Sequence, residues 1–254
     1  MLFEGRGITK RFGGLVAIDG LDIAIPEGKI TALIGPNGAG KSTCFNLMCG
    51  FYPVTSGTLN FAGEDVTALP AHALARRGIA RTFQTTSLFA SHSVLDNAIV
   101  GRHRHTRSGL FDALLRSPRT RREEQASIEA AYEALRFAGI AGLAGRIAGS
   151  IPHEAQKRLA LAIAVAAEPK LVLLDEPVAG VTSEETGAHG RLIRAMAARG
   201  LTICLVEHKM DVVMGLADRI IVLHHGRKIA EGTPAEVSGD TAVIDAYLGA
   251  AHHA

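Results

Sequence analysis

Aromatic residues and long apolar runs are the features that this sequence has least of. It has no tryptophan, and aromatic residues make up 5% of its 254 positions. The longest apolar stretches, residues 159–167 and 171–174, are much shorter than the roughly 20 residues that a membrane-spanning helix needs. Residues 1–5 lack the basic and then apolar pattern of a signal peptide. We therefore expect a soluble chain with no membrane span and no signal peptide.

Cysteine and net charge are scarce as well. Cys44, Cys49 and Cys204 lack the spacing of metal ligands and lie in apolar surroundings, which predicts reduced, buried thiols in a cytosolic protein. The chain has 27 Lys and Arg against 25 Asp and Glu, so its net charge of +2 indicates no particular partner. With 47% hydrophobic residues, it can bury one large core or two unequal lobes, and its length fits one α/β unit with an inserted subdomain.

A glycine-rich segment carries the strongest signal. It consists of Gly35, Pro36, Asn37, Gly38, Ala39, Gly40, Lys41, Ser42 and Thr43. It lies between a predicted strand, residues 29–34, and a predicted helix, residues 42–49, which is the order that a phosphate-binding loop requires. The glycines let backbone amides approach anionic oxygens, Lys41 adds a charge for the β- and γ-phosphates, and the Ser42 hydroxyl can bind Mg²⁺. The segment predicts ATP and Mg²⁺ as ligands.

A second segment, LVLLDEP at residues 171–177, supplies two carboxylates. Asp175 closes an apolar strand, which places it at the sheet edge where open α/β sheets bind ligands, and it can hold Mg²⁺ directly or through water. Glu176 points differently along the chain and can orient or deprotonate the attacking water. A surface acidic pair is the alternative, but acids directly after four buried apolar residues are rarely idle. His208 follows another predicted buried strand, residues 201–206, although a lone histidine there is more often structural than catalytic.

Residues 94–148 have a helical, arginine-rich pattern, which predicts an α-helical subdomain inserted between residues 1–93 and 149–254. The basic residues of the insert are Arg102, His103, Arg104, His105, Arg107, Arg116, Arg119, Arg121 and Arg122. Such a run could bind nucleic acid or lipid headgroups, but Glu123 and Glu124 follow it and no aromatic ladder is interleaved. A solvated helical face near a membrane partner is the better interpretation, and we expect no nucleic-acid partner.

The glycine-rich segment, Gln84, residues 171–176 and His208, in this order, resemble the nucleotide-binding subunit of an ABC transporter over nearly the whole chain. The resemblance implies an α/β fold, a P-loop NTPase cassette with a RecA-like core, an N-terminal antiparallel β subdomain and an inserted α-helical subdomain. It implies that Phe12 stacks on adenine, that Gln84 senses Mg²⁺ and the attacking water, and that His208 contacts the γ-phosphate. Judged from the residues alone, Phe12 is a core aromatic.

Several further segments resemble the branched-chain amino-acid uptake group of that family. They are RGIARTFQ at residues 77–84, GLF at 109–111, VEHKM at 206–210 and AYLG at 246–249. The same group includes importers of urea and short amides, and the chain does not choose the solute because other subunits contact it. The resemblance implies an ATPase bound peripherally to the cytoplasmic face of the plasma membrane. Its partners would be transmembrane permease subunits, a second cassette in a homodimer or heterodimer, and a periplasmic or extracellular substrate-binding protein.

One segment departs from the family pattern. Where the family carries a signature such as LSGGQ, which caps the ATP held by a partner cassette, this chain has Ile151, Pro152, His153, Glu154 and Ala155. Glu154 replaces the glycine whose amides meet the partner's γ-phosphate, and two unit charges about 4 Å apart repel by roughly 4 kcal/mol at an effective dielectric constant near 20. Alternatively, Pro152 and Glu154 are good first-turn residues of a stable helix, and both interpretations can hold together.

Thr182 also departs, because the family has aspartate or asparagine there to contact the partner; with Glu185 it predicts a helix capping box. We therefore hypothesise an asymmetric pair, in which this chain has a complete site of its own but gives its partner a poor signature, so that activity needs a partner cassette. A non-transport ABC protein that uses ATP as a clamp is one alternative, although such proteins usually carry extra domains or two cassettes. A regulatory subunit that binds ATP without hydrolysis is another, and Glu176 and His208 argue against it.

Overall fold

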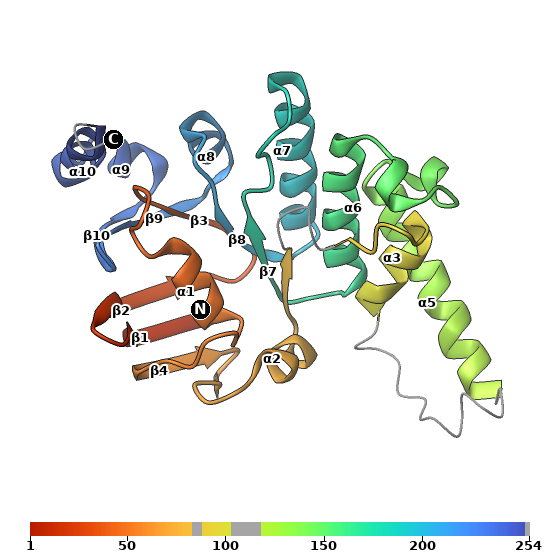
Figure 1. Ribbon diagram of the computed structural model, residues 1–254, viewed down its shortest axis with the longest axis horizontal. Coiled ribbons are helices and arrows are strands. Elements are labelled where there is room, and N and C mark those ends of the chain that lie inside the picture. Colours follow the sequence, from red (N-terminus) through yellow and green to blue (C-terminus); the bar gives the residue numbers. More distant parts are fainter. Residues whose placement is uncertain (83–87, 103–117, 252–254) are drawn as a thin grey trace. The chain divides into compact units, whose positions relative to one another are not determined.

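The computed structural model describes residues 1–82, 88–102 and 118–251. The chain divides into two compact units (Figure 1). The first comprises Met1–Arg81, Lys170–Pro177 and Ile193–Ala254, and the second comprises Thr82–Pro169 and Val178–Leu192.

An antiparallel sheet forms the N-terminal part of the first unit. Its strands, in spatial order, are β2 (Leu15–Ile25), β1 (Phe3–Phe12), β4 (Ser56–Phe61) and β5 (Glu64–Asp65). In β1 the side chains of Phe3 and Ile8 are buried, and Phe3 is paired with Ile25 on one side and with Phe61 on the other. The register of β1 shifts between Gly5 and Ile8, so two side chains five residues apart can both be buried.

The second sheet of this unit is mostly parallel. Its strands, in spatial order, are β10 (Arg227–Gly232), β9 (Arg219–His224), β3 (Ile30–Ile34), β8 (Thr202–Val206), β7 (Leu171–Asp175) and β6 (Ile79–Thr82). Strand β3 pairs in parallel with β8 and β9, and β7 pairs in parallel with β8. Every residue of β3 and β8 is buried, as their unbroken apolar sequences predict. The carboxyl ends of β3, β7 and β8 therefore meet at one edge of the sheet.

The sequence pattern of residues 220–224, 225–226 and 228–230 predicts a closing hairpin, and the structure confirms it. Strands β9 and β10 are antiparallel and are joined by His225 and Gly226, whose φ angles are 48° and 77°. Two successive positive φ angles are typical of the two-residue turn that best suits the twist of a hairpin.

One hydrophobic core connects the two sheets of the first unit around helix α1 (Figure 1). The helices of this unit are α1 (Lys41–Met48), α2 (Ala71–Arg77), α8 (Met210–Leu216), α9 (Pro234–Ser238) and α10 (Thr241–Ala251). Helix α1 contributes Phe45 and Met48 to the core, beside Phe61 from one sheet and Leu173 from the other. The three cysteines are free thiols, buried as predicted, and burial raises the pKa of Cys44 to about 12.

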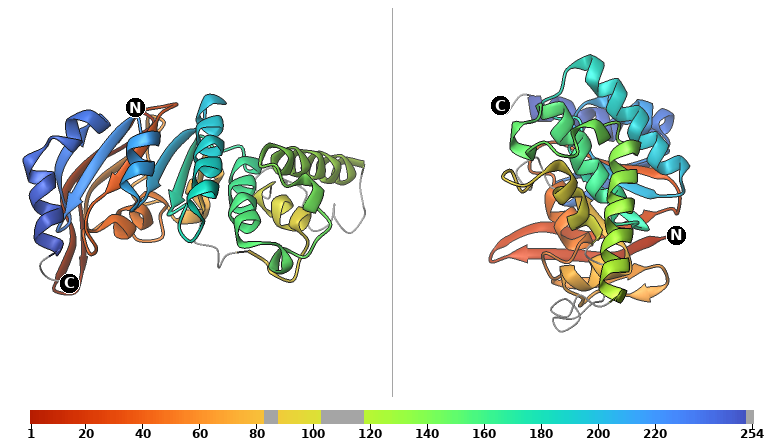
Figure 2. Two further views of the ribbon diagram at one scale, coloured as in Figure 1. Left: turned by 90° about the horizontal axis from the view of Figure 1, so that it is seen from above. Right: turned by 90° about the vertical axis from the view of Figure 1, so that its right-hand side faces the viewer.

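The second unit is helical. It contains α3 (Val94–Val100), α5 (Pro118–Phe137), the 3₁₀ turns Ala141–Leu143 and Ala148–Ser150, α6 (His153–Ala166) and residues 183–192 of α7 (Ser183–Ala198). Helices α3, α5 and α6 pack on one another (Figure 2). The helical segment expected at residues 94–148 lies inside this unit, and α6 extends it because its apolar residues, such as Leu159 and Ala162, are buried there. Among the described residues, no helix is long and apolar enough to cross a membrane.

Candidate nucleotide-binding site

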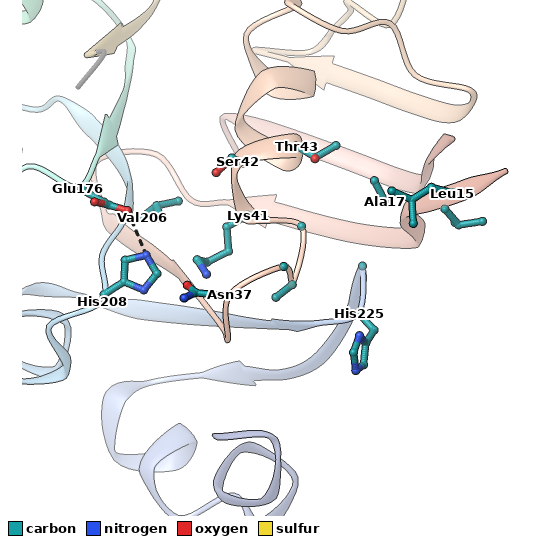
Figure 3. A pocket seen from close by; sticks show the side chains of 15 residues that line it. Leu15, Ala17, Asn37, Lys41, Ser42, Thr43, Glu176, Val206, His208 and His225 are labelled. Carbon is teal, nitrogen blue, oxygen red and sulfur yellow. Dashed lines mark ion pairs between the residues drawn. The ribbon is translucent and has the colours of Figure 1, made fainter. Parts of the chain in front are cut away.

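A pocket of about 480 Å³ opens at the carboxyl edge of the parallel sheet (Figure 3). This volume lies within the range of ligand pockets, roughly 300–1,000 Å³. Its lining comes from the start of β2, the glycine-rich loop, the first turn of α1, the end of β8 and the turn between β9 and β10. Glu176 and His208 complete it. All of these segments belong to the first unit, although the sequence separates them by up to about two hundred residues.

The glycine-rich loop has a shape that only glycine allows at two positions. Gly35 has a φ of 148°, and a Cβ there would lie 2.1 Å from the carbonyl oxygen of Leu223. Gly40 has a φ of 101°, and a Cβ there would lie 2.8 Å from the carbonyl oxygen of Ala17. The loop therefore lies directly against the backbones of β9 and β2. A side chain at either position would break the contact. Two of the three glycines are therefore required by packing as well as by the close approach of phosphate.

Gly40 is also the N-cap of α1 and has no side chain to cover the first amides of the helix. Ser42, in the first turn, is exposed. The unpaired amides and positive end of a helix favour an anion at this place. The Ser42 hydroxyl and the Glu176 carboxylate line the pocket, and Asp175 ends the neighbouring strand β7. These are hard oxygen ligands of the kind that Mg²⁺ prefers, so the residues present fit both a phosphate chain and its magnesium ion.

Lys41 is 6% exposed, and its Nζ donates hydrogen bonds to the carbonyl oxygens of Gly35 at 2.7 Å and Pro36 at 2.9 Å. Burial lowers the pKa of Lys41, and the negative charge of Glu176 opposes this effect. The ammonium group is thus held inside the loop by its own backbone, in the position from which it can reach phosphate oxygens.

Glu176 and His208 meet across the pocket, with His208 Nε2 3.1 Å from Glu176 Oε1 (Figure 3). The backbone of Glu176 has a φ of 48°, an unusual conformation for a residue with a side chain, and its amide donates to the carbonyl oxygen of Val206 at 3.0 Å. Such strain is typical of functional sites. The two residues follow neighbouring strands, β7 and β8, so the sheet itself brings them together.

Asp175 is not among the residues that line the pocket. It ends β7, and its Oδ2 accepts a hydrogen bond from Arg81 at 2.8 Å. The two side chains are 13% and 9% exposed. This ion pair joins residues 94 positions apart, and sequence reasoning missed it.

Phe12 also lies outside the lining residues. Its ring is 41% exposed and meets Tyr52 edge to face, with the ring centres 5.2 Å apart and Lys10 Nζ 4.9 Å from the centre of the Phe12 ring. Phe12 is therefore not the core aromatic that the residues alone suggest. Gln84 lies outside the described residues.

The altered signature forms the start of α6 in the second unit. Ile151 is buried, Pro152 is the N-cap with φ −54° and ψ 149°, and His153 begins the helix. Pro152 thus lies one residue before the first-turn position expected for it, because its ψ is extended rather than helical. Glu154 is in the first turn as expected, and its Oε1 accepts a hydrogen bond from Arg158 one turn later. Ala155 is buried.

The capping box predicted at Thr182 is confirmed. The Thr182 amide donates to Glu185 Oε2 at 2.7 Å, and the Glu185 amide donates to Thr182 Oγ1 at 3.3 Å. These bonds lower the pKa of Glu185, the backbone one most. Further along α7, His189 is 1% exposed, with Nδ1 3.0 Å from the carbonyl oxygen of Glu185.

Sequence reasoning also missed part of the pocket wall. Leu15, Val16 and Ala17 line it from β2, and His225 and Gly226 line it from the hairpin turn. The Gly226 amide donates to the carbonyl oxygen of Ala39 at 3.0 Å. The sequence indicates a turn at residues 225–226, but it does not indicate that this turn supports the glycine-rich loop.

A glycine-rich loop between a buried parallel strand and a helix, with two carboxylates at the end of another strand of the same sheet, defines the class of phosphate-loop nucleotide-binding proteins. The sequence profile of the ABC transporter family matches residues 18–179, and that of branched-chain amino acid ATP-binding cassette transporters matches residues 227–253. This chain belongs to the ABC transporter family.

Individual relatives agree with this assignment. The chain is 38% identical to the high-affinity branched-chain amino acid transport ATP-binding protein BraF of Pseudomonas aeruginosa and 39% identical to LivG of Salmonella typhimurium, in each case covering 98% of both chains. Among solved structures, a nucleotide-free ATP-binding cassette from an ABC transporter has a TM-score of 0.85 at 30% identity, covering 97% of this chain and 98% of that one. An ADP-bound cassette of an ABC transporter has a TM-score of 0.84 at 29% identity, covering 98% of both. The family resemblance and the cassette fold read from the sequence are confirmed.

Proposed function

We propose that this chain is the ATP-hydrolysing subunit of an importer for branched-chain amino acids. The observation that carries the proposal is the pocket in which the phosphate loop and the Glu176–His208 pair line the same space. The names of the relatives, which are branched-chain amino acid transport ATP-binding proteins, support the choice of solute.

The residues divide the work of hydrolysis among them. Lys41 exchanges the carbonyl oxygens of Gly35 and Pro36 for β- and γ-phosphate oxygens, while the amides of the loop and of the first turn of α1 hold the rest of the phosphate chain. Ser42 and Asp175 would hold Mg²⁺, which would supply positive charge to neutralise the phosphates. Because Asp175 is paired with Arg81, part of its charge would already be balanced when it held the metal.

Glu176 accepts the proton of the attacking water. His208 holds the carboxylate from the other side through Nε2 and contacts the γ-phosphate. The Glu176 backbone is strained, and the hydrogen bond from its amide to the Val206 carbonyl oxygen fixes it in that conformation. The carboxylate is thereby kept at the pocket instead of along the strand. Phe12, which pairs in the sheet with Leu15 of the pocket wall, stacks on adenine, and Gln84 senses the metal and the water.

The partners follow from the same role. Transmembrane permease subunits, a second cassette and a substrate-binding protein complete the importer, and the chain lies peripherally on the cytoplasmic face of the membrane. The second cassette contributes the signature that caps this chain's ATP, and the altered segment at residues 151–155 makes a heterodimer the working pair.

A Glu176→Gln variant tests the catalytic assignment. We expect ATP hydrolysis by the assembled complex to fall about 10²–10⁴-fold, the usual contribution of a general base, while nucleotide binding is retained. Hydrolysis and nucleotide retention should be measured side by side, with Glu27→Gln, an exposed carboxylate in the turn before β3, as the matched control. Unchanged turnover in the Glu176 variant would instead support a subunit that binds ATP without hydrolysing it.

Uptake assays test the solute. Membrane vesicles that carry the complete system should accumulate labelled leucine, isoleucine and valine when ATP is present inside, and Glu176→Gln should abolish the accumulation. Uptake of urea or short amides in place of these amino acids would move the assignment to another member of the group. A chain that copurifies with no membrane subunit would support the clamp alternative.

A further inference from the structure

The carboxylate assigned to the metal is already occupied by a cation of the protein itself. Arg81, on β6, donates from Nη2 to Asp175 Oδ2 at 2.8 Å, and β6 and β7 are neighbours in the parallel sheet. Both side chains are largely buried, at 9% and 13% exposed. A buried ion pair of this kind costs much more when one partner is removed than when both are replaced.

Arg81 is fixed from the opposite side as well. Its Nη1 donates to Asn46 Oδ1 at 2.5 Å and lies 3.5 Å from Cys49 Sγ. The guanidinium carbon lies 5.8 Å from the ring centre of Phe45 and 6.0 Å from that of Phe51. These four residues belong to α1 or directly follow it, so Arg81 ties the helix after the phosphate loop to the strand that carries Asp175.

The guanidinium stays charged, because arginine does not lose its proton in proteins. It is held through Nη1 and Nη2 by several residues at once, so Asp175 has a fixed positive neighbour in this structure.

Two effects on a metal ion at Asp175 then oppose each other. Arg81 orients the carboxylate, which favours binding, and it repels a divalent cation bound to that carboxylate, which disfavours binding. The repulsion scales with the product of the charges, here one and two, and acts over a short distance in a largely buried place. Fixing one short side chain gains much less, because aspartate has few rotamers to lose. The repulsion is the larger effect.

We propose that Arg81 is a positioning residue that substitutes for the metal at Asp175 in the metal-free protein and thereby raises the Mg²⁺ concentration needed to hold nucleotide. The proposal rests on the function proposed above, which assigns Asp175 to the metal. Arg81 keeps the carboxylate neutralised when the site has no metal, so the cassette folds stably in either state.

An Arg81→Met variant tests this with the purified full chain. The measurement is the MgCl₂ concentration that gives half-maximal binding of a fluorescent ATP analogue, together with the melting temperature with and without MgCl₂. We expect the half-maximal concentration to fall about fivefold or more, because a nearby positive charge is lost. We also expect the variant to have a lower melting temperature than the wild type without Mg²⁺. Addition of Mg²⁺ should raise the melting temperature of the variant more than that of the wild type.

Three further variants keep the test decisive. Arg81→Lys retains the charge and should restore the wild-type Mg²⁺ requirement, which a purely structural role would not predict. Arg77→Met removes an exposed arginine paired with Glu64 and should leave that requirement unchanged. The double variant of Arg81→Met with Asp175→Asn, in which neither charge is left alone, serves as the folded background if the single variant fails to fold: it should melt higher than the single variant.

The outcomes separate the two proposals. Should Arg81→Met need as much Mg²⁺ as the wild type or more, while Asp175→Asn needs more, the metal assignment stands and the role of Arg81 is refuted. Should Asp175→Asn leave the Mg²⁺ requirement unchanged, the metal assignment itself fails, and this inference fails with it.

Discussion

The phosphate loop and the altered signature both precede helices, and the first turns of these helices differ in charge. At α1 the N-cap is Gly40, and the first turn contains no acidic residue. At α6 the N-cap is Pro152, and Glu154 places a carboxylate in the first turn that bonds to Arg158. Neither helix has a side-chain cap, but the first turn of α6 carries a negative charge of its own. The difference supports the proposal that this chain receives phosphate better than it offers a second contact to it.

The pairing of Glu154 with Arg158 changes how the signature should be viewed. The sequence suggested a bare negative charge facing the partner's γ-phosphate, but the two side chains are only 22% and 27% exposed and lie along the helix. A neighbouring arginine offsets part of the repulsion. The bulk of a side chain in place of glycine and the acidic residue in the first turn remain.

The largest effect is expected from a substitution in the phosphate loop. In Gly35→Ala, the added Cβ would meet the Leu223 carbonyl oxygen at 2.1 Å in a backbone conformation that alanine avoids. We expect a loss of about 3 kcal/mol of stability or more and loss of nucleotide binding. Urea unfolding and nucleotide titration measure both. Gly14→Ala, where a Cβ meets nothing within 4 Å, is the matched control and should remain near wild type.

A Glu154→Gly variant tests whether the altered signature weakens dimerisation. It restores the glycine and removes the negative charge from the first turn, so we expect ATP-dependent dimerisation of the purified chain to rise about tenfold, corresponding to about 1.4 kcal/mol. Size-exclusion chromatography with ATP in the Glu176→Gln background, where nucleotide is retained, measures it.

Two arms control that experiment. Glu133→Gly removes an exposed acid from α5 with a similar loss of helix propensity and should not promote dimers. Arg158→Gln leaves the Glu154 charge without its partner on α6 and should weaken dimerisation further. Vigorous ATP hydrolysis by the wild-type homodimer would refute the asymmetric pair.

The smallest effect concerns the surroundings of the signature and its dependence on pH. Burial lowers the pKa of His189; the bond to the Glu185 carbonyl oxygen and the charge of Glu154 oppose this, and Arg158 and Lys157 add to it. Because a carbonyl oxygen only accepts, Nδ1 carries the proton, and Nε2 is buried without a hydrogen bond. The neutral form is therefore the one that fits the fold.

A group whose folded-state pKa lies below its unfolded value of about 6.5 binds protons more readily in the unfolded chain. Its contribution to stability is present above about pH 6.5 and is lost as the pH falls below that value toward the folded pKa. In His189→Gln we expect a shallower fall of melting temperature between pH 7 and 5, by roughly 2–4 °C per kcal/mol recovered. Exposed His72→Gln should keep the wild-type slope, and a His189 variant that also keeps it would show that another group controls this range.

The sequence predicted the parts of the site that local patterns encode. The loop between β3 and α1, the two carboxylates after an apolar strand, the turn at residues 225–226 and the capping box at Thr182 each depend on a few adjacent residues. The cassette fold was implied by the resemblance of the ordered motifs to the ABC transporter family, and it is confirmed.

What it did not predict depends on pairs that meet only after folding. Arg81 and Asp175 are brought together by neighbouring strands, and Phe12 and Tyr52 by the loop that follows α1. The position of Pro152 differed by one residue because proline fixes φ but not ψ, so the sequence cannot choose between N-cap and first turn. The sequence likewise did not show whether the Glu154 side chain faces solvent or pairs with Arg158, and the structure shows the pair.

The hairpin turn that supports the phosphate loop has a consequence for how the chain is made. The Gly226 amide bonds to Ala39, and its carbonyl oxygen accepts from the amide of Asp19 at 3.0 Å, so the loop is held by chain that the ribosome adds almost two hundred residues later. A nascent chain that stops short of this turn has every glycine of the loop but lacks the part of the wall that bonds to Ala39. We therefore expect the ability to bind nucleotide to arise late in synthesis, once this turn has been made, and to distinguish a finished cassette from a truncated one.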